Sequence, residues 1–235
     1  MSLKNWDNKT WLSSPSYIKS FNNFLLKQVK LNKNSQILDI GCGRGKILGS
    51  LSSKLSFKRK SIGIDIENHK DRDKRIIFKK IDALKFLKKN KKRFDLILVK
   101  QTIHLFKIKD IKTILKLSKR LLNSNGKIII FTLDPINNKI PTFSIMKKKL
   151  KKALIRDKKI IKSISCSFKG KIVRGFSYKV KISKKKYMEM VNSKYISVLL
   201  GMSHKLISSG LNEIKKKYKK QISFQDKLIC LVLNR

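Results

Sequence analysis

The sequence predicts an α/β fold built around an open, mostly parallel sheet, and three observations carry this prediction. Short runs rich in Ile, Leu, Val and Phe recur as far as Phe131. Acidic residues stand at or near the ends of three of these runs, and amphipathic segments with helical spacing separate several of them. Strands that alternate with helices are typical of βαβ units, in which the strands are parallel and both faces of the sheet are covered.

The first apolar run, Gln36–Ile40, leads directly into the segment Gly41-Cys42-Gly43-Arg44-Gly45. Glycine at alternate positions lets the backbone adopt positive φ and lets a ligand approach the chain closely. Lys46–Leu55 then has apolar residues at helical spacing, and the N-terminus of a helix offers unpaired N–H groups. This order indicates a nucleotide-type cofactor site. The NAD fingerprint G-x-G-x-x-G is incomplete, because Lys46 stands where its last glycine is needed.

Four further runs predict strands in the same part of the chain. Ser61–Asp65 ends in an acid at the spacing that a βαβ unit requires, so Asp65 is placed to accept hydrogen bonds from both hydroxyls of a ribose. The other runs are Arg75–Ile81, which is followed by Asp82 and Ala83, then Phe94–Lys100, and finally Asn125–Phe131, which follows a helix-like segment from Lys109 to Leu122.

The glycine segment resembles motif I of the class I S-adenosylmethionine (SAM) dependent methyltransferases, D-x-G-x-G-x-G, and the order of the runs is similar to the order of strands in that family. The resemblance covers most of the chain and is strongest from Gln36 to Phe131. It implies a Rossmann-like seven-stranded sheet with an antiparallel last strand, SAM as cofactor, and a carboxylate, Asp82, that accepts from the adenine amine. The implied cofactor-binding residues are Asp39, Gly41, Cys42, Gly43, Gly45, Asp65, Ile66, Asp82, Ala83 and Lys100.

Carboxylates suit this cofactor, because SAM carries a sulfonium and an ammonium group as well as several hydroxyls. Asp39, Asp65 and Asp82 all fall at predicted strand ends in a chain that has few acids. The alternative is that Asp simply favours the turns that follow strands.

The segment after the fourth strand, Lys100–Phe106, faces the transferred methyl group in the resembled fold. It contains neither Asn-Pro-Pro-Tyr nor Asp-Pro-Pro-Tyr, which argues against methylation of the adenine amine, and it has no Pro-Cys for the covalent route to cytosine C5. His104 is the one group here that could take a proton near neutral pH. It is either a weak candidate for a general base or a positioned packing residue. His69 and His204 form no ligand cluster with it, so we predict no metal.

Beyond Asp134 the pattern changes, and we expect a region that caps the substrate. Within it we predict an amphipathic helix over Phe143–Leu154, strands over Ile160–Phe168 and Lys171–Ile182, and helices capped by Ser183 and Ser203. Phe224–Leu233 resembles the family's last strand, inserted antiparallel at the sheet edge.

The predicted organisation is a single methyltransferase domain. Residues 1–35 form N-terminal lid helices, 36–134 the SAM-binding core, 135–222 the cap or substrate region, and 223–235 the last strand. Trp11, Tyr17 and Phe21 are either a lid over the cofactor or ordinary apolar anchors of a first helix.

The formal net charge of +45 is the largest compositional outlier and suggests contact with RNA or DNA. Lysines run through every segment, however, so solvated helix faces explain the charge equally simply, and an anionic membrane surface is a third possibility. No segment has the length and apolarity of a signal peptide or a membrane span, so we expect a cytoplasmic protein. Three scattered cysteines indicate reduced thiols.

These patterns together predict SAM-dependent methyl transfer to a small-molecule acceptor at O, N or C. Two alternatives stay open: an RNA or ribosome methyltransferase, favoured by the charge, and a catalytically silent protein that uses the SAM-binding fold as a binding module. The sequence identifies neither the acceptor nor the oligomeric state.

Overall fold

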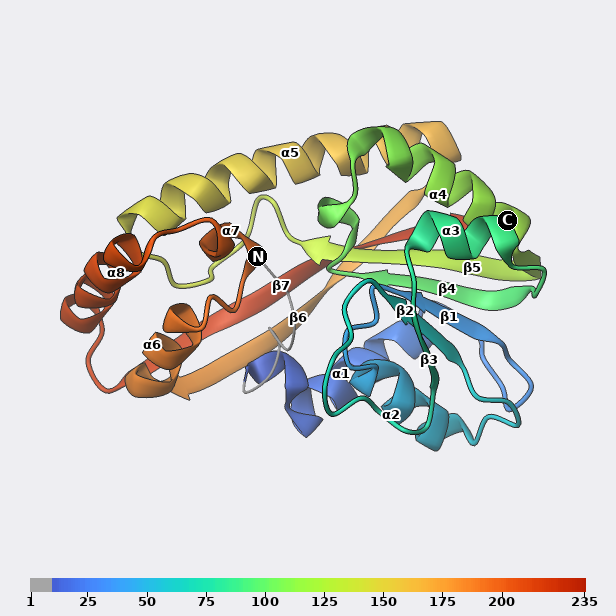
Figure 1. Ribbon diagram of the computed structural model, residues 1–235, viewed down its shortest axis with the longest axis horizontal. Coiled ribbons are helices and arrows are strands. Elements are labelled where there is room, and N and C mark those ends of the chain that lie inside the picture. The colour runs from blue at the N-terminus through green and yellow to red at the C-terminus, as the bar shows by residue number, and fades with distance from the viewer. Residues whose placement is uncertain (1–9) are drawn as a thin grey trace.

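The computed structural model describes residues 10–235, and a seven-stranded sheet forms its centre (Figure 1). The strands are β1 (Ile37–Ile40), β2 (Ile62–Asp65), β3 (Ile77–Lys80), β4 (Phe94–Lys100), β5 (Leu122–Leu133), β6 (Lys171–Ser183) and β7 (Gln221–Asn234). Their order across the sheet is β3-β2-β1-β4-β5-β7-β6. β1 to β5 are parallel, and β7 runs antiparallel to both of its neighbours. The predicted mostly parallel sheet with an antiparallel last strand is confirmed.

Helices cover both faces of the sheet. Successive residues of a strand point to opposite faces, and here the residues on both faces are apolar and pack against helices. Leu96 and Leu98 of β4 pack with α1 (Pro15–Leu26) and α2 (Lys46–Leu55). The intervening Ile97 packs instead with α3 (Ala83–Lys89), α4 (Ile108–Arg120) and α5 (Ser144–Phe168). Strands buried on both faces explain why the predicted runs are continuously apolar.

β6 and β7 form a ribbon that extends past the end of the parallel sheet. Leu228–Asn234 of β7 pairs with β5 and Gln221–Gln225 pairs with β6 alone, so this half of the ribbon projects beyond β5. It carries α6 (Lys184–Asn192), α7 (Ser197–Leu200) and α8 (His204–Lys217) at one end of the molecule (Figure 1). Ser183 and Ser203 cap α6 and α8 as predicted.

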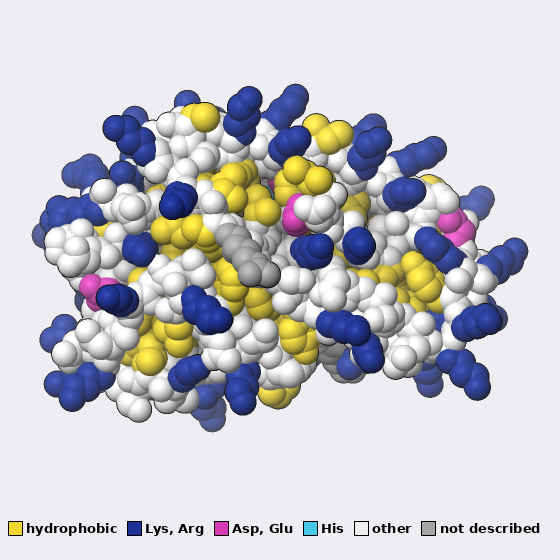
Figure 2. All heavy atoms as spheres, turned by 180° about the vertical axis from the view of Figure 1, so that it is seen from behind, with side chains coloured by type: hydrophobic (Ala, Val, Ile, Leu, Met, Phe, Trp, Pro, Cys, Tyr) yellow, Lys and Arg dark blue, Asp and Glu magenta, His cyan; other side chains and the backbone are white. Residues whose placement is uncertain are grey.

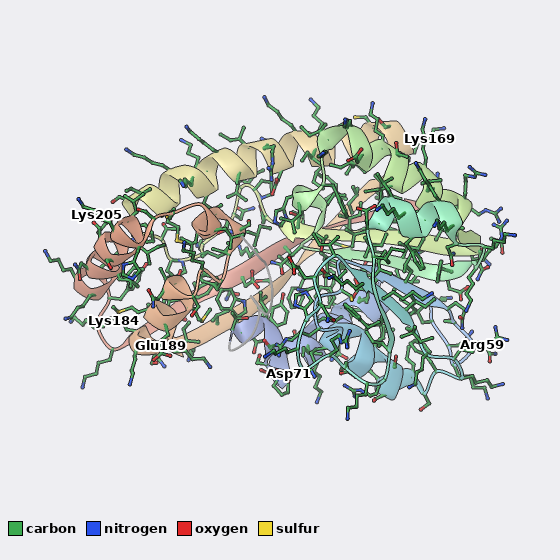
Figure 3. The ribbon with its side chains drawn as sticks, viewed as in Figure 1. Arg59, Asp71, Lys169, Lys184, Glu189 and Lys205 are labelled. Carbon is green, nitrogen blue, oxygen red and sulfur yellow. The ribbon has the colours of Figure 1, made fainter. Side chains whose placement is uncertain are left out.

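Residues 135–222, which we expected to form the cap, also contribute a strand to the central sheet. β6 is the edge strand of the sheet, and the last strand of the chain, β7, lies second from the edge rather than at it. α6 to α8 and the N-terminal part of α5 lie beyond the sheet at the end of the ribbon (Figure 1). Figure 3 labels Lys184, Glu189 and Lys205 at this helical end, and Arg59 at the opposite end of the molecule.

One predicted strand is wrong. Ile160–Phe168 is the last part of the 25-residue helix α5, which also includes the predicted helix at Phe143–Leu154. Ile160, Ile161 and Ile164 are buried against the sheet at helical spacing. Packing of this face on the sheet overrides the preference of the β-branched residues for strands.

The N-terminal aromatic residues have two different positions. Tyr17 and Phe21 of α1 are fully buried and pack against Phe131 and Phe176, so they are anchors of the first helix. Trp11 begins the short 3-10 helix η1 (Trp11–Ser13) and contacts the C-terminal part of the chain. The first nine residues of the predicted lid lie outside the described residues.

Positive side chains spread around the outline of the face shown in Figure 2 instead of gathering in one patch. This distribution is typical of solvated helix and loop surfaces. A search for a bilayer-crossing helix among residues 10–235 finds none of sufficient length and apolarity.

Candidate functional site

A cavity of about 360 Å³ opens at the C-terminal ends of the parallel strands. Ligands of open α/β sheets bind at this edge, because the loops that follow parallel strands meet there. Ten of the residues singled out in the sequence line it: Asp39, Gly41, Cys42, Gly43, Asp65, Ile66, Asp82, Ala83, Lys100 and His104. Gly45 is not part of the lining. It precedes α2 as the N-cap residue, with a φ of 71°.

The glycine loop, Gly41–Gly45, packs tightly against a neighbouring side chain at one glycine and leaves open space beside another. Gly41 has a φ of 73°, and a Cβ there would come within 2.3 Å of the Thr102 side chain, which follows β4. Gly43 has a φ of 55°, and a Cβ on it would meet no atom within 4 Å. Gly41 is therefore needed for packing, whereas Gly43 leaves the backbone accessible to a ligand. Burial raises the pKa of the Cys42 thiol, which agrees with a small, unreactive residue in the loop.

Asp39 places a carboxylate on the floor of the cavity. The residue is 4% exposed, and its Oδ1 has no hydrogen-bond partner among the described residues. Burial raises its pKa to about 7, although the Lys100 ammonium opposes this shift. Lys100 Nζ donates to Gln101 Oε1 at 3.0 Å and lies 5.2 Å from the ring centroids of both Tyr17 and Phe21.

Asp65 braces the glycine loop from the end of β2. Its Oδ2 accepts from the Gly43 N–H at 2.9 Å, and its Oδ1 accepts from the Glu67 N–H at 3.0 Å. His69 Nε2 lies 3.6 Å from Oδ1. Burial alone would raise the pKa of Asp65, but the hydrogen bonds from His69 and the two backbone groups outweigh it and hold the pKa below its usual value. Asp65 is thus ionised at neutral pH.

The buried position of His69 was not predicted from the sequence, where it stands in a polar segment. Its side chain lies against Asp65 and also lines the cavity. The signal that could have revealed it is its spacing of four residues from the acid that ends β2.

The third acid, Asp82, has a structural role that the sequence also allows. Its side chain caps α3 by accepting from the Lys85 N–H at 3.0 Å. Beside it the cavity has apolar walls formed by Ala83 and by Ile66, which is 60% exposed. An exposed isoleucine next to a carboxylate offers one apolar surface and one acceptor to a flat polar ring.

His104 lines the cavity from the short 3-10 helix η2 (Ile103–Leu105). Its Nε2 is 3.5 Å from the Ser197 hydroxyl, and its carbonyl oxygen accepts from Arg156 at 3.0 Å. Burial lowers the pKa of the ring, Asp157 opposes this shift, and Arg156 adds to it. The imidazole is therefore neutral at neutral pH and able to accept a proton.

Asp226 is the second buried carboxylate of the cavity, and the sequence analysis did not identify it. It is 0% exposed on β7, and its Oδ2 accepts from the Trp11 indole N–H at 2.9 Å. Burial raises its pKa, while the hydrogen bond from Trp11, the charge of Lys100 and a hydrogen bond from the Tyr17 hydroxyl oppose the shift.

The charge of the cavity contrasts with the charge of the chain. Among the described residues, six acids line it, Asp39, Asp65, Asp82, Asp110, Asp157 and Asp226, compared with four Lys or Arg residues. Across the part of the chain that the structure describes, no three His, Cys, Asp or Glu residues are grouped to hold a metal ion. The described lining is thus richer in acids than in Lys and Arg, within a basic protein.

Comparison with known proteins agrees with this fold. A putative methyltransferase of an antibiotic biosynthesis pathway from Anabaena variabilis superposes with a TM-score of 0.64 at 14% identity, covering 92% of this chain and 96% of that one. A putative methyltransferase from Bacillus halodurans gives 0.52 at 14% identity, with coverages of 92% and 98%. The plantazolicin methyltransferase BpumL, in complex with S-adenosylhomocysteine (SAH), gives 0.51 at 17% identity, with coverages of 98% and 88%.

No curated protein sequence matches the chain. A family model described as "Methyltransferase domain" matches residues 31–195, which is more than half of the sequence and includes the glycine loop and the loops after β2, β3 and β4. The chain therefore belongs to the methyltransferase domain family, and it is a SAM-dependent methyltransferase with the class I fold.

Proposed function

We propose that the chain transfers the methyl group of SAM to a small-molecule acceptor inside the cavity. The observation that carries the proposal is the concentration of acids in this cavity, since six acids of the described residues line it in a chain of net charge +45. A cavity of such charge favours a cationic ligand against the field of the rest of the protein. SAM supplies an electrophilic methyl group on a positively charged sulfur.

The residues of this chain fit the cofactor. Asp39 and Asp226 share the single ammonium of Lys100, so Asp39 offers an unsatisfied carboxylate oxygen to a cationic group. Beyond its two backbone bonds and its hydrogen bond from His69, the carboxylate of Asp65 keeps a lone pair for a ribose hydroxyl. We assign the adenine to the apolar walls at Ile66 and Ala83, beside Asp82, and the backbone of Gly41, Cys42 and Gly43 to the rest of the cofactor.

Methyl transfer from a sulfonium is an in-line displacement, which depends on alignment and exclusion of water. The Lys100–Phe106 segment borders the cavity where the acceptor must approach, and α5, α7 and the residues just before α7 also line it. We assign His104 the role of a base that takes a proton from the acceptor. The alternative is a packing residue held by Ser197 and Arg156, and the two roles differ in their effect on turnover.

A small acceptor is supported by the size and lining of the cavity. A volume of about 360 Å³ is that of a small-ligand pocket. The structural neighbours include BpumL in complexes with SAH and desmethylPZN analogues, and a methyltransferase of an antibiotic biosynthesis pathway. RNA is the weaker candidate acceptor, because positive side chains spread around the face shown in Figure 2, whereas four Lys or Arg residues of the described part of the chain line the cavity.

The test begins with calorimetric titration of the full chain with SAM, SAH and NAD at moderate salt. We expect binding of both sulfur ligands and no binding of NAD. Transfer of a labelled methyl group to a metabolite extract, compared with bulk RNA, then identifies the acceptor class. Labelled RNA would favour the RNA methyltransferase, and SAM binding without labelled product in any fraction would favour the silent binding module.

The cofactor assignment predicts a specific loss in Asp65→Ala. Removing the ribose partner, which also braces the Gly43 N–H, weakens SAM binding by about 1–3 kcal/mol. Asp71→Asn removes a carboxylate from the nearby exposed loop and is the matched control (Figure 3). Equal SAM affinity in Asp65→Ala and the control would contradict the assignment of β2 to the ribose.

A further inference from the structure

His69 is a buried polar side chain beside the acid that ends β2. It belongs to the loop of residues 66–76 that joins β2 to β3, and it is 4% exposed, whereas its neighbours Asn68 and Lys70 are exposed. Burying an imidazole costs free energy unless its ring N–H has a hydrogen-bond partner. Its Nε2 lies 3.6 Å from Oδ1 of Asp65. The loop thus places a donor against a carboxylate that lines the cavity.

Packing of the same loop on the glycine loop and on α2 fixes where His69 lies. The Asp73 N–H donates to the Arg44 carbonyl oxygen at 2.9 Å, and the Asp73 Oδ1 accepts from Arg75 Nε at 2.8 Å. A Cβ on Gly49 of α2 would come within 2.4 Å of three carboxyl atoms of Asp73, so the loop packs this closely because Gly49 has no side chain. The loop is therefore anchored a few residues beyond His69.

The donors around Asp65 decide which of its lone pairs a ligand can use. Oδ1 faces the Glu67 N–H and His69 Nε2, whereas Oδ2 accepts from the Gly43 N–H at 2.9 Å. A carboxylate oxygen has two lone pairs, so Oδ2 keeps one of them. The Asp65 side chain is 13% exposed and lines the cavity, so a ligand can reach it. The donors from Glu67 and Gly43 are backbone groups, which makes His69 the partner supplied by a side chain.

We propose that His69 is a positioning residue for ribose recognition. Its Nε2–H holds Oδ1 of Asp65, which fixes the rotation of the carboxylate and leaves Oδ2 to accept from a ribose hydroxyl. The inference rests on the proposed function, which assigns Asp65 to the ribose of SAM, and it names the side chain on which that contact depends. A carboxylate already held by three donors loses little rotational freedom when the ligand binds, so the ribose contact costs less entropy.

The experiment compares two ligands, SAH and the analogue of SAH that lacks both ribose hydroxyls. Each is titrated calorimetrically into the full wild-type chain and into the variants His69→Leu and His69→Gln. Leu has no donor, whereas the amide of Gln can donate to Oδ1 of Asp65 in place of Nε2. We expect His69→Leu to weaken SAH binding about tenfold and binding of the analogue by less than about twofold. His69→Gln should recover most of the SAH affinity.

His204→Leu makes the same substitution at the exposed start of α8 and should change neither affinity. Equal weakening of SAH and of its analogue by His69→Leu would overturn the inference, because a residue that only supports the fold affects both ligands alike. An unchanged SAH affinity in His69→Leu would overturn it as well, since the carboxylate of Asp65 would then hold its position without the imidazole.

The wild-type chain gives a second test, which does not depend on whether the His69 variants fold. NMR of the chain with isotope-labelled histidines shows which ring nitrogens carry protons, and spectra of His104→Gln and His204→Gln identify the signals of the other two histidines. We expect a proton on Nε2 of His69 with and without SAH. A His69 ring without a proton on Nε2 would overturn the inference.

Failure of the inference and failure of the proposed function give different results. If the wild-type chain binds SAH and the analogue equally, the assignment of Asp65 to the ribose fails, and the role of His69 fails with it, while SAM stays the cofactor. If the wild-type chain does not bind SAH, the proposed function itself fails. If the wild-type chain prefers SAH and His69→Leu keeps that preference in full, the inference about His69 alone is wrong.

Discussion

The proposed contact of Asp39 with the cofactor predicts that cofactor binding depends on pH. Its pKa of about 7 in the unliganded protein means that half of the molecules hold a proton there at neutral pH. A cationic cofactor binds the ionised form better, so binding releases that proton. We expect SAM affinity to rise between pH 6 and pH 8 and to fall by about tenfold per pH unit well below 7.

Calorimetry in two buffers of different ionisation enthalpy measures this proton release directly. The number of protons released should approach one at acidic pH and decline to zero at alkaline pH. Asp39→Asn, which keeps the shape and cannot titrate, should show a flat profile. A wild-type profile equally flat would mean that the carboxylate does not face the cofactor's charge.

Variants of His104 distinguish a role in catalysis from a role in packing. Because burial holds its pKa below 6.5, the ring is neutral in the physiological range, and the rate should fall as the pH drops below that value and the ring gains a proton. His104→Gln should lower kcat by about 10²–10⁴ and leave the affinity for SAM unchanged. His204→Gln, at the exposed start of α8, is the control. Unchanged kcat with reduced stability would identify His104 as a packing residue.

The sequence predicted the acids at the ends of the parallel strands better than it predicted Asp226. Asp39, Asp65 and Asp82 are readable because each acid ends or follows its own strand, so local pattern places all three at one edge. Asp226 has no such signal. Its position in the cavity depends on a hydrogen bond to Trp11 across 215 residues and on the route of the β6–β7 ribbon, neither of which is encoded locally.

At the scale of elements, local sequence patterns correctly predicted the starts of α6 and α8 but wrongly predicted a strand within α5. Ser183 and Ser203 accept from backbone N–H groups three residues later, as their positions in the sequence predicted. Ile164, Cys166 and Phe168 alternate as in a strand, yet Cys166 is exposed and the buried face follows helical spacing from Ile160 to Ile164. Burial against the sheet, which local pattern cannot show, decided the structure of that segment.

The cap on α8 gives a prediction for the stability of the helical end of the molecule. Ser203→Ala removes the acceptor for the Leu206 N–H and should lower the free energy of unfolding by about 1 kcal/mol. Ser208→Ala changes the same residue type at an exposed interior position of α8 and should be neutral or stabilising by a few tenths of a kcal/mol. Urea unfolding of both variants measures the difference. Equal stabilities would mean that packing alone fixes the start of α8.

At the scale of the whole molecule, repulsion among the surplus positive charges opposes folding. The few acids lie in loops and around the cavity. With 59 Lys and Arg against 14 Asp and Glu, most cations have no acid to pair with. In the described residues, Asp73 pairs with Arg75, Asp157 pairs with Arg156, and Asp65 pairs with His69. The acids therefore serve loops and the cavity, and most of the positive charge of the surface has no acid to neutralise it.

This imbalance predicts an unusual response to salt. Repulsion among surface cations destabilises the compact state, and salt screens it with a Debye length of about 10 Å at 0.1 M. Raising NaCl from 20 to 300 mM should therefore increase the melting temperature by several degrees, since about 1 kcal/mol shifts a domain of this size by 2–4 °C. RNA binding driven by the same cations would weaken over the same range. Thermal unfolding and an RNA titration over the same salt series thus measure two effects of the same surface cations, one on stability and one on RNA affinity. A melting temperature that falls with salt would mean that ion pairs, rather than repulsion, dominate the surface.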